Sequence, residues 1–215
     1  MSTSAERRIE LRDGNWATLR ALPYDDPVAH YLVEQVQAEY VARYGGPDGA
    51  VVEPGEFLPP RGLFLVAEVE GVPAGCGAWR ALPSGAAEIK RVYVEPAFRR
   101  RGLAQAVVAE LEAAAARAGH PSVVLNTGRQ QPEALALYAD LGYGPVPGYG
   151  IYACAPDAVF LGKDLPPAGE RTSTPAQVGA QDRAPGEGRT PVDDRDGADL
   201  PSAGETHGEE PSWAS

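Results

Sequence analysis

Residues 26–45 carry apolar side chains at every fourth position, which is the spacing of one face of an α-helix. The members of this stripe are Val28, Leu32, Val36 and Tyr40. Side chains four residues apart lie one above another on a helix, so the stripe would face the protein core. Gly45 and Gly46 follow directly, and glycine commonly ends a helix. The pattern predicts a helix over residues 26–45.

Shorter apolar runs bounded by turn residues predict strands on both sides of this helix. Four such runs occur in the first half of the chain: residues 9–12, 16–22, 62–70 and 74–82. The first two flank the turn 13–15 and suggest a hairpin, and the last two flank the turn 71–73. We expect each pair to be antiparallel.

Residues 87–96 predict a further strand in which the alternation of apolar positions slips once. Ile89 and Val92 are three residues apart, whereas Val92 and Val94 are two apart. One extra residue on one strand of a pair is a β-bulge, which would produce this slip. A strand whose two faces are less sharply segregated would produce it equally well.

The remaining elements alternate between helix and strand. Leu103, Val107, Leu111 and Ala115 define a helix over residues 102–118, with Gly119 where a helix-ending glycine belongs. Residues 121–128 predict a short strand covered on both faces, and residues 132–142 a helix with Pro132 in its first turn. Residues 149–165 hold one or two further strands. The order predicts a mixed α/β (α+β) fold.

Composition divides the 215 residues into two parts. Residues 166–215 contain seven prolines, seven glycines, ten acidic and four basic residues, so they offer too little apolar surface to offset the entropy of ordering. We expect one folded domain over 1–165 and a disordered acidic tail over 166–215.

A formal net charge of −11 argues against nucleic acid and anionic membranes as partners. No stretch approaches the ~20 apolar residues of a membrane span, and the N-terminus lacks the apolar run of a signal peptide. Two cysteines and three histidines show no metal-binding spacing. We expect a cytoplasmic protein without a metal, either a monomer or a homodimer.

Three adjacent arginines, Arg99, Arg100 and Arg101, precede Gly102 at the start of the predicted helix over residues 102–118. The N-terminus of a helix presents unpaired N–H groups and a partial positive charge, so it favours an anion. Gly102 lets the backbone approach a ligand closely, and arginines bind phosphate with paired N–H donors. The segment predicts a phosphorylated ligand, with a pyrophosphate as the favoured group.

The run from Arg99 to Ala104 resembles the (Q/R)-x-x-G-x-(G/A) signature of the GNAT superfamily of acetyl-CoA-dependent N-acetyltransferases. Residues 134–143, ALALYADLGY, resemble that family's A-x-x-L-Y-x-x-x-G-(F/Y) motif. The resemblance covers roughly residues 7–165 and is strongest over 86–143. It implies a mostly antiparallel sheet with a bulged strand that splays from its neighbour, and the cofactor lies in that gap.

The resemblance also implies a cofactor site. The backbone of the strand at Val92, Tyr93 and Val94 would pair with the pantetheine arm. The amides of Arg100, Arg101, Gly102, Leu103 and Ala104 would hold the pyrophosphate. One of the three arginines would reach the ribose 3′-phosphate. The family often has Asn seven residues before the helix tyrosine; this chain has Gln131 there and Asn126 upstream, so either of these contacts pantetheine.

Two side chains are candidates for proton transfer. Glu88 lies on the strand from which many GNAT enzymes present a base, and a base is needed because an alkylamine is mostly protonated at neutral pH. Tyr138 matches the family tyrosine that protonates the CoA thiolate. The alternatives are an ordinary solvated glutamate and a core aromatic on the face of Leu137 and Leu141.

The acceptor is the feature that the sequence leaves most open. Loop 46–61, with Asp48, Glu53 and Glu56, would suit a cationic amine if these acids line the acceptor side rather than face solvent, and Tyr149 and Tyr152 would close the same side. The resemblance implies transfer of acetyl to a primary amine, of a small molecule or a peptide, in a ternary complex. Alternatives are a silent acyl-CoA sensor and a module that acts through its acidic tail.

Overall fold

The architecture is that of a computed structural model, which describes residues 6–167. Eight strands form one sheet in the order β1-β2-β3-β4-β5-β6-β8-β7. The strands are β1 Arg7–Glu10, β2 Trp16–Ala21, β3 Gly62–Val69, β4 Val72–Ala81, β5 Ala87–Val94, β6 Ser122–Gly128, β7 Gly144–Pro145 and β8 Ala158–Asp164. Every neighbouring pair is antiparallel except β5 and β6, which are parallel. The mixed fold predicted from the sequence is confirmed.

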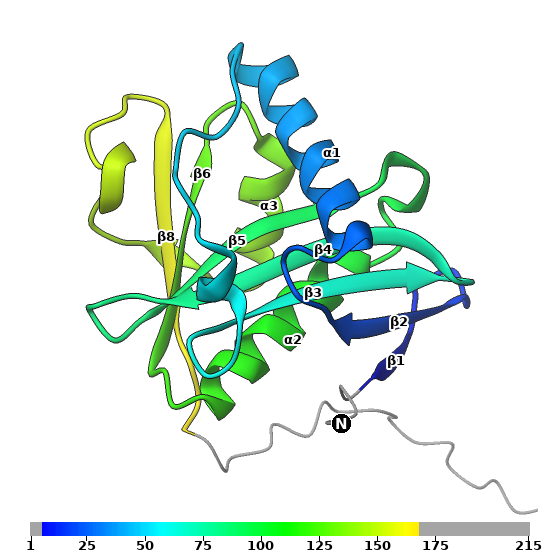
Figure 1. The fold of residues 1–215 in the computed structure, drawn as a ribbon. Coiled ribbons are helices and arrows are strands. Elements are labelled where there is room, and N and C mark those ends of the chain that lie inside the picture. Colours follow the sequence, from blue (N-terminus) through cyan, green and yellow to red (C-terminus); the bar gives the residue numbers. More distant parts are fainter. Residues whose placement is uncertain (1–5, 168–215) are drawn as a thin grey trace, which may run out of the picture. The chain divides into compact units, whose positions relative to one another are not determined.

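Three helices cover the two faces of the sheet (Figure 1). Helix α1, Pro27–Tyr44, packs through Ala29, Leu32 and Val36 on one core cluster, together with Phe57 and Phe64. Helix α2, Leu103–Arg117, and helix α3, Pro132–Asp140, contribute to a second cluster. The predicted stripes of α1 and α2 therefore bury against opposite faces of one sheet.

The predicted β-bulge lies between β4 and β5. Cys76 pairs with Tyr93 and Ala78 pairs with Lys90, so two residues of β5 oppose the single Gly77. Arg91, inside the bulge, has a φ of 59°, in the left-handed region that a non-glycine residue rarely adopts. The slip in the sequence pattern is thus a bulge and not a poorly segregated strand.

Some predicted elements differ from those observed. The turn before β4 is made by Glu70 and Gly71, both at positive φ, so residues 72 and 73 belong to β4. Strand β6 is fully buried only at alternate positions, and Asn126 of its other face borders the cavities described below. Residues 149–165 hold one strand, β8, after the 3₁₀ turn η3, Gly150–Tyr152. The short β7 was not predicted.

Loop 46–61 is interrupted by the 3₁₀ turn η1, Pro54–Phe57, and a second such turn, η2, Pro96–Phe98, follows β5. Within residues 6–167, no helix is long and apolar enough to cross a membrane. The sequence predicts a disordered tail over residues 166–215. Residues 168–215 of it lie outside the part of the chain that the structure describes.

Candidate active site

The sheet opens between its two parallel strands. Strand β5 pairs with β6 only at residues 87–89, where Ala87, Glu88 and Ile89 face Val123, Val124 and Leu125. Beyond Ile89 and Leu125 the two strands no longer pair, and their separated segments border two cavities. The bulge at Arg91 accounts for this opening, because it redirects β5 just after the last residue that pairs with β6.

The larger cavity, of about 500 Å³, runs along the separated part of β5 to the N-terminus of α2. Its lining includes nearly all the residues predicted to bind a cofactor: Val92, Tyr93, Val94, Arg99, Arg100, Gly102, Leu103, Ala104, Asn126 and Gln131. Tyr138 of α3 also lines it. Two predicted residues, Arg101 and Glu88, do not.

The turn before α2 combines two residues in the left-handed region, Arg100 at φ 63° and Gly102 at φ 86°. Gly102 is the residue directly before the helix, so its conformation sets the direction in which the first N–H groups of α2 point. A turn of this kind, leading into unpaired helix amides, forms a concave site for an anion.

The three arginines have different surroundings. Arg99 donates to the carbonyl of Val94 and pairs with Glu39. Arg101 donates to the carbonyl of Ala97 and pairs with Asp13, with 3.2 Å between Nη1 and Oδ2. Among the described residues Arg100 has no ion pair, although it lines the larger cavity. Of the three guanidiniums, that of Arg100 is therefore the one left without an acceptor within residues 6–167.

Arg12 also lines the larger cavity and was not predicted from the sequence. Its backbone N–H donates to the carbonyl of Arg101, and its side chain lies against Gly102 and donates to Gln105. It comes from the loop that joins β1 and β2, some ninety positions earlier in the chain, and no local pattern marks it.

Asn126 and Gln131 both border the larger cavity, and their hydrogen bonds differ. Gln131 Oε1 accepts a hydrogen bond from the Thr127 hydroxyl at 2.7 Å. Asn126 Nδ2 is buried and has no partner among the described residues. A buried amide N–H without an acceptor costs free energy, so Asn126 is the side chain with an unfilled donor.

Tyr138 is 6% exposed and packs against the ring of Tyr143 at a centroid distance of 5.3 Å. Burial raises the pKa of its hydroxyl well above the usual value, and Tyr40 adds to the effect. The hydroxyl therefore stays protonated at neutral pH, as a proton donor must.

Glu88 is buried, lines neither cavity and pairs with Arg80. Its Oε2 accepts from Arg80 Nε at 2.7 Å, and Arg80 also contacts Glu56 at 2.9 Å. The exposed fraction of Glu88 is 4%. Any proton that reaches Glu88 from the cavities must pass through another group, because the carboxylate lines neither of them.

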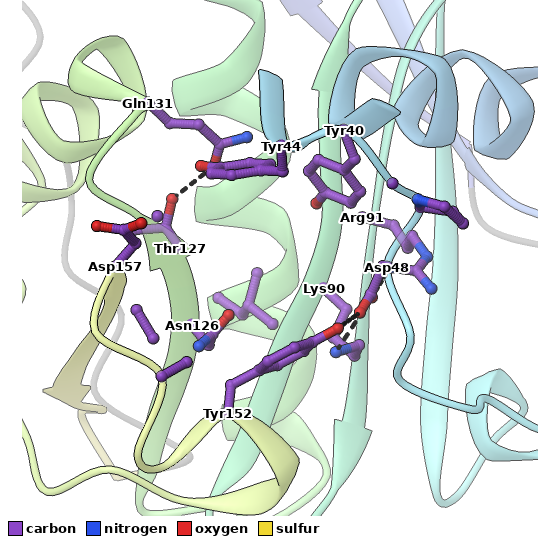
Figure 2. Close-up of a pocket in the computed structure, with 16 residues that line it drawn as sticks. Tyr40, Tyr44, Asp48, Lys90, Arg91, Asn126, Thr127, Gln131, Tyr152 and Asp157 are labelled. Atoms are coloured by element: carbon purple, nitrogen blue, oxygen red, sulfur yellow. Dashed lines mark hydrogen bonds and ion pairs between the residues drawn. The ribbon is translucent and has the colours of Figure 1, made fainter. Parts of the chain in front are cut away.

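The smaller cavity, of about 330 Å³, lies between the end of α1, loop 46–61, the separated strands and the segment around η3. Figure 2 shows Tyr44 and Tyr152 on opposite sides of it, with Lys90 and Asp48 on one flank and Asp157 on the other. Seven residues line both cavities, so the two adjoin: Tyr40, Ile89, Lys90, Arg91, Asn126, Thr127 and Gln131.

Asp48 organises one wall of the smaller cavity. Its carboxylate pairs with Arg91 and accepts hydrogen bonds from the Tyr152 hydroxyl at 2.7 Å and the Ala50 amide at 2.9 Å. Burial by itself would raise the pKa of Asp48, but these donors outweigh it and lower the pKa below its usual value. Of the loop acids and tyrosines considered for the acceptor side, Asp48 and Tyr152 line this cavity, whereas Glu53, Glu56 and Tyr149 do not.

Sequence reasoning missed Lys90, Arg91, Tyr40 and Asp157 as cavity residues. Tyr40 was counted only in the apolar stripe of α1, and Asp157 lies in a stretch without a motif. The signal for the other two was the bulge, because a lysine and an arginine at a kink in a central strand cannot both face solvent. Within residues 6–167, no group of three His, Cys, Asp or Glu side chains could hold a metal ion.

Comparisons with known proteins agree with this geometry. The chain is 28% identical over 152 residues to an IAA acetyltransferase from Azospirillum brasilense, covering 70% of this chain and 99% of that protein. It is 34% identical over 108 residues to an uncharacterised N-acetyltransferase from Schizosaccharomyces pombe, and the match covers 49% of this chain and 66% of that protein.

Solved structures agree as well. One is a Klebsiella pneumoniae protein described as an acyl-CoA N-acyltransferase, with a TM-score of 0.59, 28% identity, and coverage of 69% of this chain and 97% of that one. The GNAT domain of S. lividans PAT shares the fold, with a TM-score of 0.59 at 21% identity. The match covers 74% of this chain and 97% of that one.

The family model described as "Acetyltransferase (GNAT) family" matches residues 20–143, more than half of the chain. The match contains the bulged and splayed strands, the turn before α2 and Tyr138. Enzymes of this family transfer acetyl groups from acetyl-CoA to amines. The chain belongs to the GNAT family of acetyltransferases.

Proposed function

We propose that this chain transfers an acetyl group from acetyl-CoA to a primary amine by direct attack in a ternary complex. The observation that carries the proposal is that two cavities adjoin where β5 leaves β6 and share seven lining residues. Two ligands, one in each cavity, would meet at this junction. The larger cavity is the cofactor side in this proposal, and the smaller cavity is the acceptor side.

The residues of the larger cavity fit acetyl-CoA. Beyond Ile89, β5 has no partner strand on its β6 side, so the backbone of Val92 and Val94 can bond the pantetheine arm there as a further strand would. The Val94 carbonyl also accepts from Arg99 Nε. The amides of Gly102, Leu103 and Ala104 would hold the pyrophosphate where α2 begins at the larger cavity, and Arg100 has no acceptor within the described residues. The buried Asn126 Nδ2 lacks a partner, which favours Asn126 over Gln131 as the pantetheine contact. Bound acetyl-CoA supplies the activated acetyl thioester.

Direct transfer is favoured because neither cysteine is placed to carry the acetyl group. Cys76 is fully buried, and its thiol donates to the carbonyl of Arg91 at 3.2 Å. Burial raises the pKa of the Cys76 thiol, so it does not form the thiolate that would attack a thioester. Neither Cys76 nor Cys154 lines either cavity.

Proton transfer in this proposal uses Tyr138 as the acid that protonates the departing thiolate. Glu88 remains the proposed base, and it acts through an intervening group because it does not reach the cavities. Asp157 is the alternative base: it lines the smaller cavity and, among the described residues, has no ion pair. Glu88→Gln and Asp157→Asn would separate the two, since only the true base removes the low-pH limb of the rate profile.

The first experiment is a calorimetric titration of acetyl-CoA and of free CoA into the full chain, with acetate as a control, followed by an amine-dependent assay of thiol release. We expect micromolar binding of both CoA species. Arg100→Ala should weaken binding by roughly 10- to 100-fold, because it loses a charge-assisted hydrogen bond to phosphate.

Arg101→Ala is the matched control, since Arg101 already pairs with Asp13 and does not line the cavity. It should change the affinity by less than about threefold. An absence of CoA binding would overturn the proposed function. Equal losses in both variants would leave the function standing and remove Arg100 from the phosphate site.

A further inference from the structure

Lys90 is an amine that the fold buries without a hydrogen-bond partner. It is the first residue of β5 beyond the paired segment, and it lines both cavities. Its side chain is 12% exposed. Its Nζ lies 3.7 Å from Glu88 Oε1 and 4.0 Å from Asp48 Oδ2, and both distances are too long for hydrogen bonds. Within the described residues the ammonium group makes no hydrogen bond.

The two nearby carboxylates are already engaged by other groups. Glu88 accepts from Arg80, and Asp48 accepts from Arg91, Tyr152 and the Ala50 amide. The Asp48 oxygen nearest Lys90, Oδ2, already accepts from Arg91, and Glu88 is held by Arg80 through its other oxygen, Oε2. Burial lowers the pKa of Lys90, and Glu88 and Asp48 oppose that effect. An anionic ligand group at Nζ would supply the missing hydrogen bonds.

The charge of the cavity limits what kind of anion fits. Lys90 and Arg91 on one flank are balanced by Asp48 beside them and by Asp157 on the opposite flank (Figure 2). A purely anionic or purely cationic ligand would leave a net charge in a partly buried space, whereas a zwitterion would leave none. A single lysine also suits a carboxylate better than a doubly charged phosphate.

The position of Lys90 limits where the reacting amine can be. Lys90 stands at the junction of the two cavities, and the acceptor amine has to reach the acetyl group at the same junction. A carboxylate held by Lys90 and the amine that reacts must therefore be close together in one molecule. An α-amino acid, whose two groups are separated by one carbon atom, meets this requirement. Its side chain would extend between Tyr44 and Tyr152.

We propose that the acceptor is a free α-amino acid and that Lys90 binds its carboxylate in the smaller cavity. The proposal rests on the proposed function and narrows it to one substrate class. It assigns a specificity-determining role to Lys90. Tyr44 and Tyr152 make the side-chain site a partly aromatic one, with Asp157 at its edge.

The test uses matched pairs of amines: phenylalanine, methionine and lysine, each compared with its α-amide. The full chain is first shown by calorimetry to bind acetyl-CoA, and thiol release then gives kcat/KM for each amine. The wild-type enzyme should prefer the free acid over the amide by at least about tenfold. The amide amine is the less protonated one, so intrinsic reactivity works against this result.

Lys90→Met should lower kcat/KM for the free acids by roughly 10- to 100-fold and leave the amides nearly unchanged. Lys90→Arg should restore part of the preference, since it restores the charge. Lys163→Met is the matched control, because Lys163 pairs with Glu112 and lines neither cavity; it should keep the wild-type ratio. The ratio of acid to amide does not depend on the fraction of folded enzyme.

The outcomes separate this proposal from the proposed function. If acetyl-CoA does not bind, the proposed function fails and this proposal fails with it. If acetyl-CoA binds but the amides are acetylated as well as the free acids, or no free acid is acetylated, the amino-acid proposal is overturned and acetyl transfer to another amine stands. An unchanged ratio in Lys90→Met removes Lys90 from the acceptor site.

Discussion

At the scale of a single residue, Tyr138 is both a core side chain and a side chain that lines a cavity. Its ring is buried against Tyr143, as the apolar face of α3 predicts. Its side chain also lines the larger cavity, as the family motif implies. Sequence periodicity reports only that a side chain faces the protein interior, and a cavity is part of that interior.

Tyr138→Phe should lower kcat by roughly 10- to 1000-fold, because it removes the hydroxyl that would protonate the thiolate. Its affinity for CoA should stay within about threefold of wild type. Steady-state kinetics and calorimetry measure the two quantities.

Tyr143→Phe is the control for Tyr138→Phe. Tyr143 packs at a tilt against the same ring, but its hydroxyl donates to Glu112 and does not line a cavity. That variant should lose about 1 kcal/mol of stability and keep its kcat. A kcat for Tyr138→Phe equal to that of wild type would return this tyrosine to a purely structural role.

At the scale of elements, loop 46–61 is fastened to β5 and to η3 through one carboxylate. Asp48 reaches Arg91, whose side chain is 2% exposed, and the Tyr152 hydroxyl. Arg91 is more than forty residues from Asp48 in the sequence, and Tyr152 is more than one hundred residues from it. Acidic residues in a glycine- and proline-rich loop carry no local sign of such partners.

Asp48→Asn should lower the free energy of unfolding by about 3 kcal/mol at neutral pH, because it leaves Arg91 buried without its counter-ion. The pKa of Asp48 is lower in the folded protein, so its contribution is complete above the unfolded value, about 3.9. It is lost as the pH falls through the folded pKa. Urea denaturation over this pH range should show the gap between wild type and variant closing in acid.

Asp157→Asn is the control for the urea denaturation of Asp48→Asn at different pH values. Asp157 is exposed and has no ion pair among the described residues, so its removal should change stability by less than about 0.5 kcal/mol at any pH. A gap between wild type and Asp48→Asn that stays constant down to the lowest pH would show that the Asp48 charge does not stabilise the fold.

The bulge of β4 and β5 depends on a glycine beneath α2. A Cβ at Gly77 would lie 2.7 Å from Val107 Cγ1 and 2.9 Å from Leu111 Cδ1, both fully buried. Gly77→Val should therefore cost about 1–3 kcal/mol through overpacking. The matched variant is Gly144→Val in β7, where a Cβ meets nothing within 4 Å, and it should be nearly neutral. Chemical denaturation of both variants measures the two changes in the free energy of unfolding.

At the scale of the whole molecule, the sheet is complete before the acidic segment begins. Strand β8 ends at Asp164, and the Leu165 amide donates to the carbonyl of Pro121. Among the residues that the structure describes, none beyond Ala158 lines either cavity. A chain ending at residue 165 should therefore keep the wild-type kcat/KM and CoA affinity within about twofold.

Kinetic assays of the shortened and full chains, side by side, measure this. A loss of acetyl transfer with retained folding would assign the acidic segment a part in the activity. It would also favour the interaction-module alternative raised by its composition.

The sequence by itself determined the local features of this protein. Periodicity indicated the three helices, the parity slip before Val92 was compatible with a bulge or with a less segregated strand, and the run from Arg99 to Ala104 predicts an anion site. These features depend on residues within a few turns of one another, so their signals are contained in short stretches of sequence.

Only the tertiary structure decided which charged groups are free to act. It tied Glu88 to Arg80 and Asp48 to Arg91. Within the described residues it left Arg100 without an ion pair, and it left Lys90 with two long ion pairs and no hydrogen bond. Ion pairing depends on which distant segments come within a few ångströms of one another. The sheet order and the splay of β5 from β6 set those distances, and no short stretch of sequence contains them.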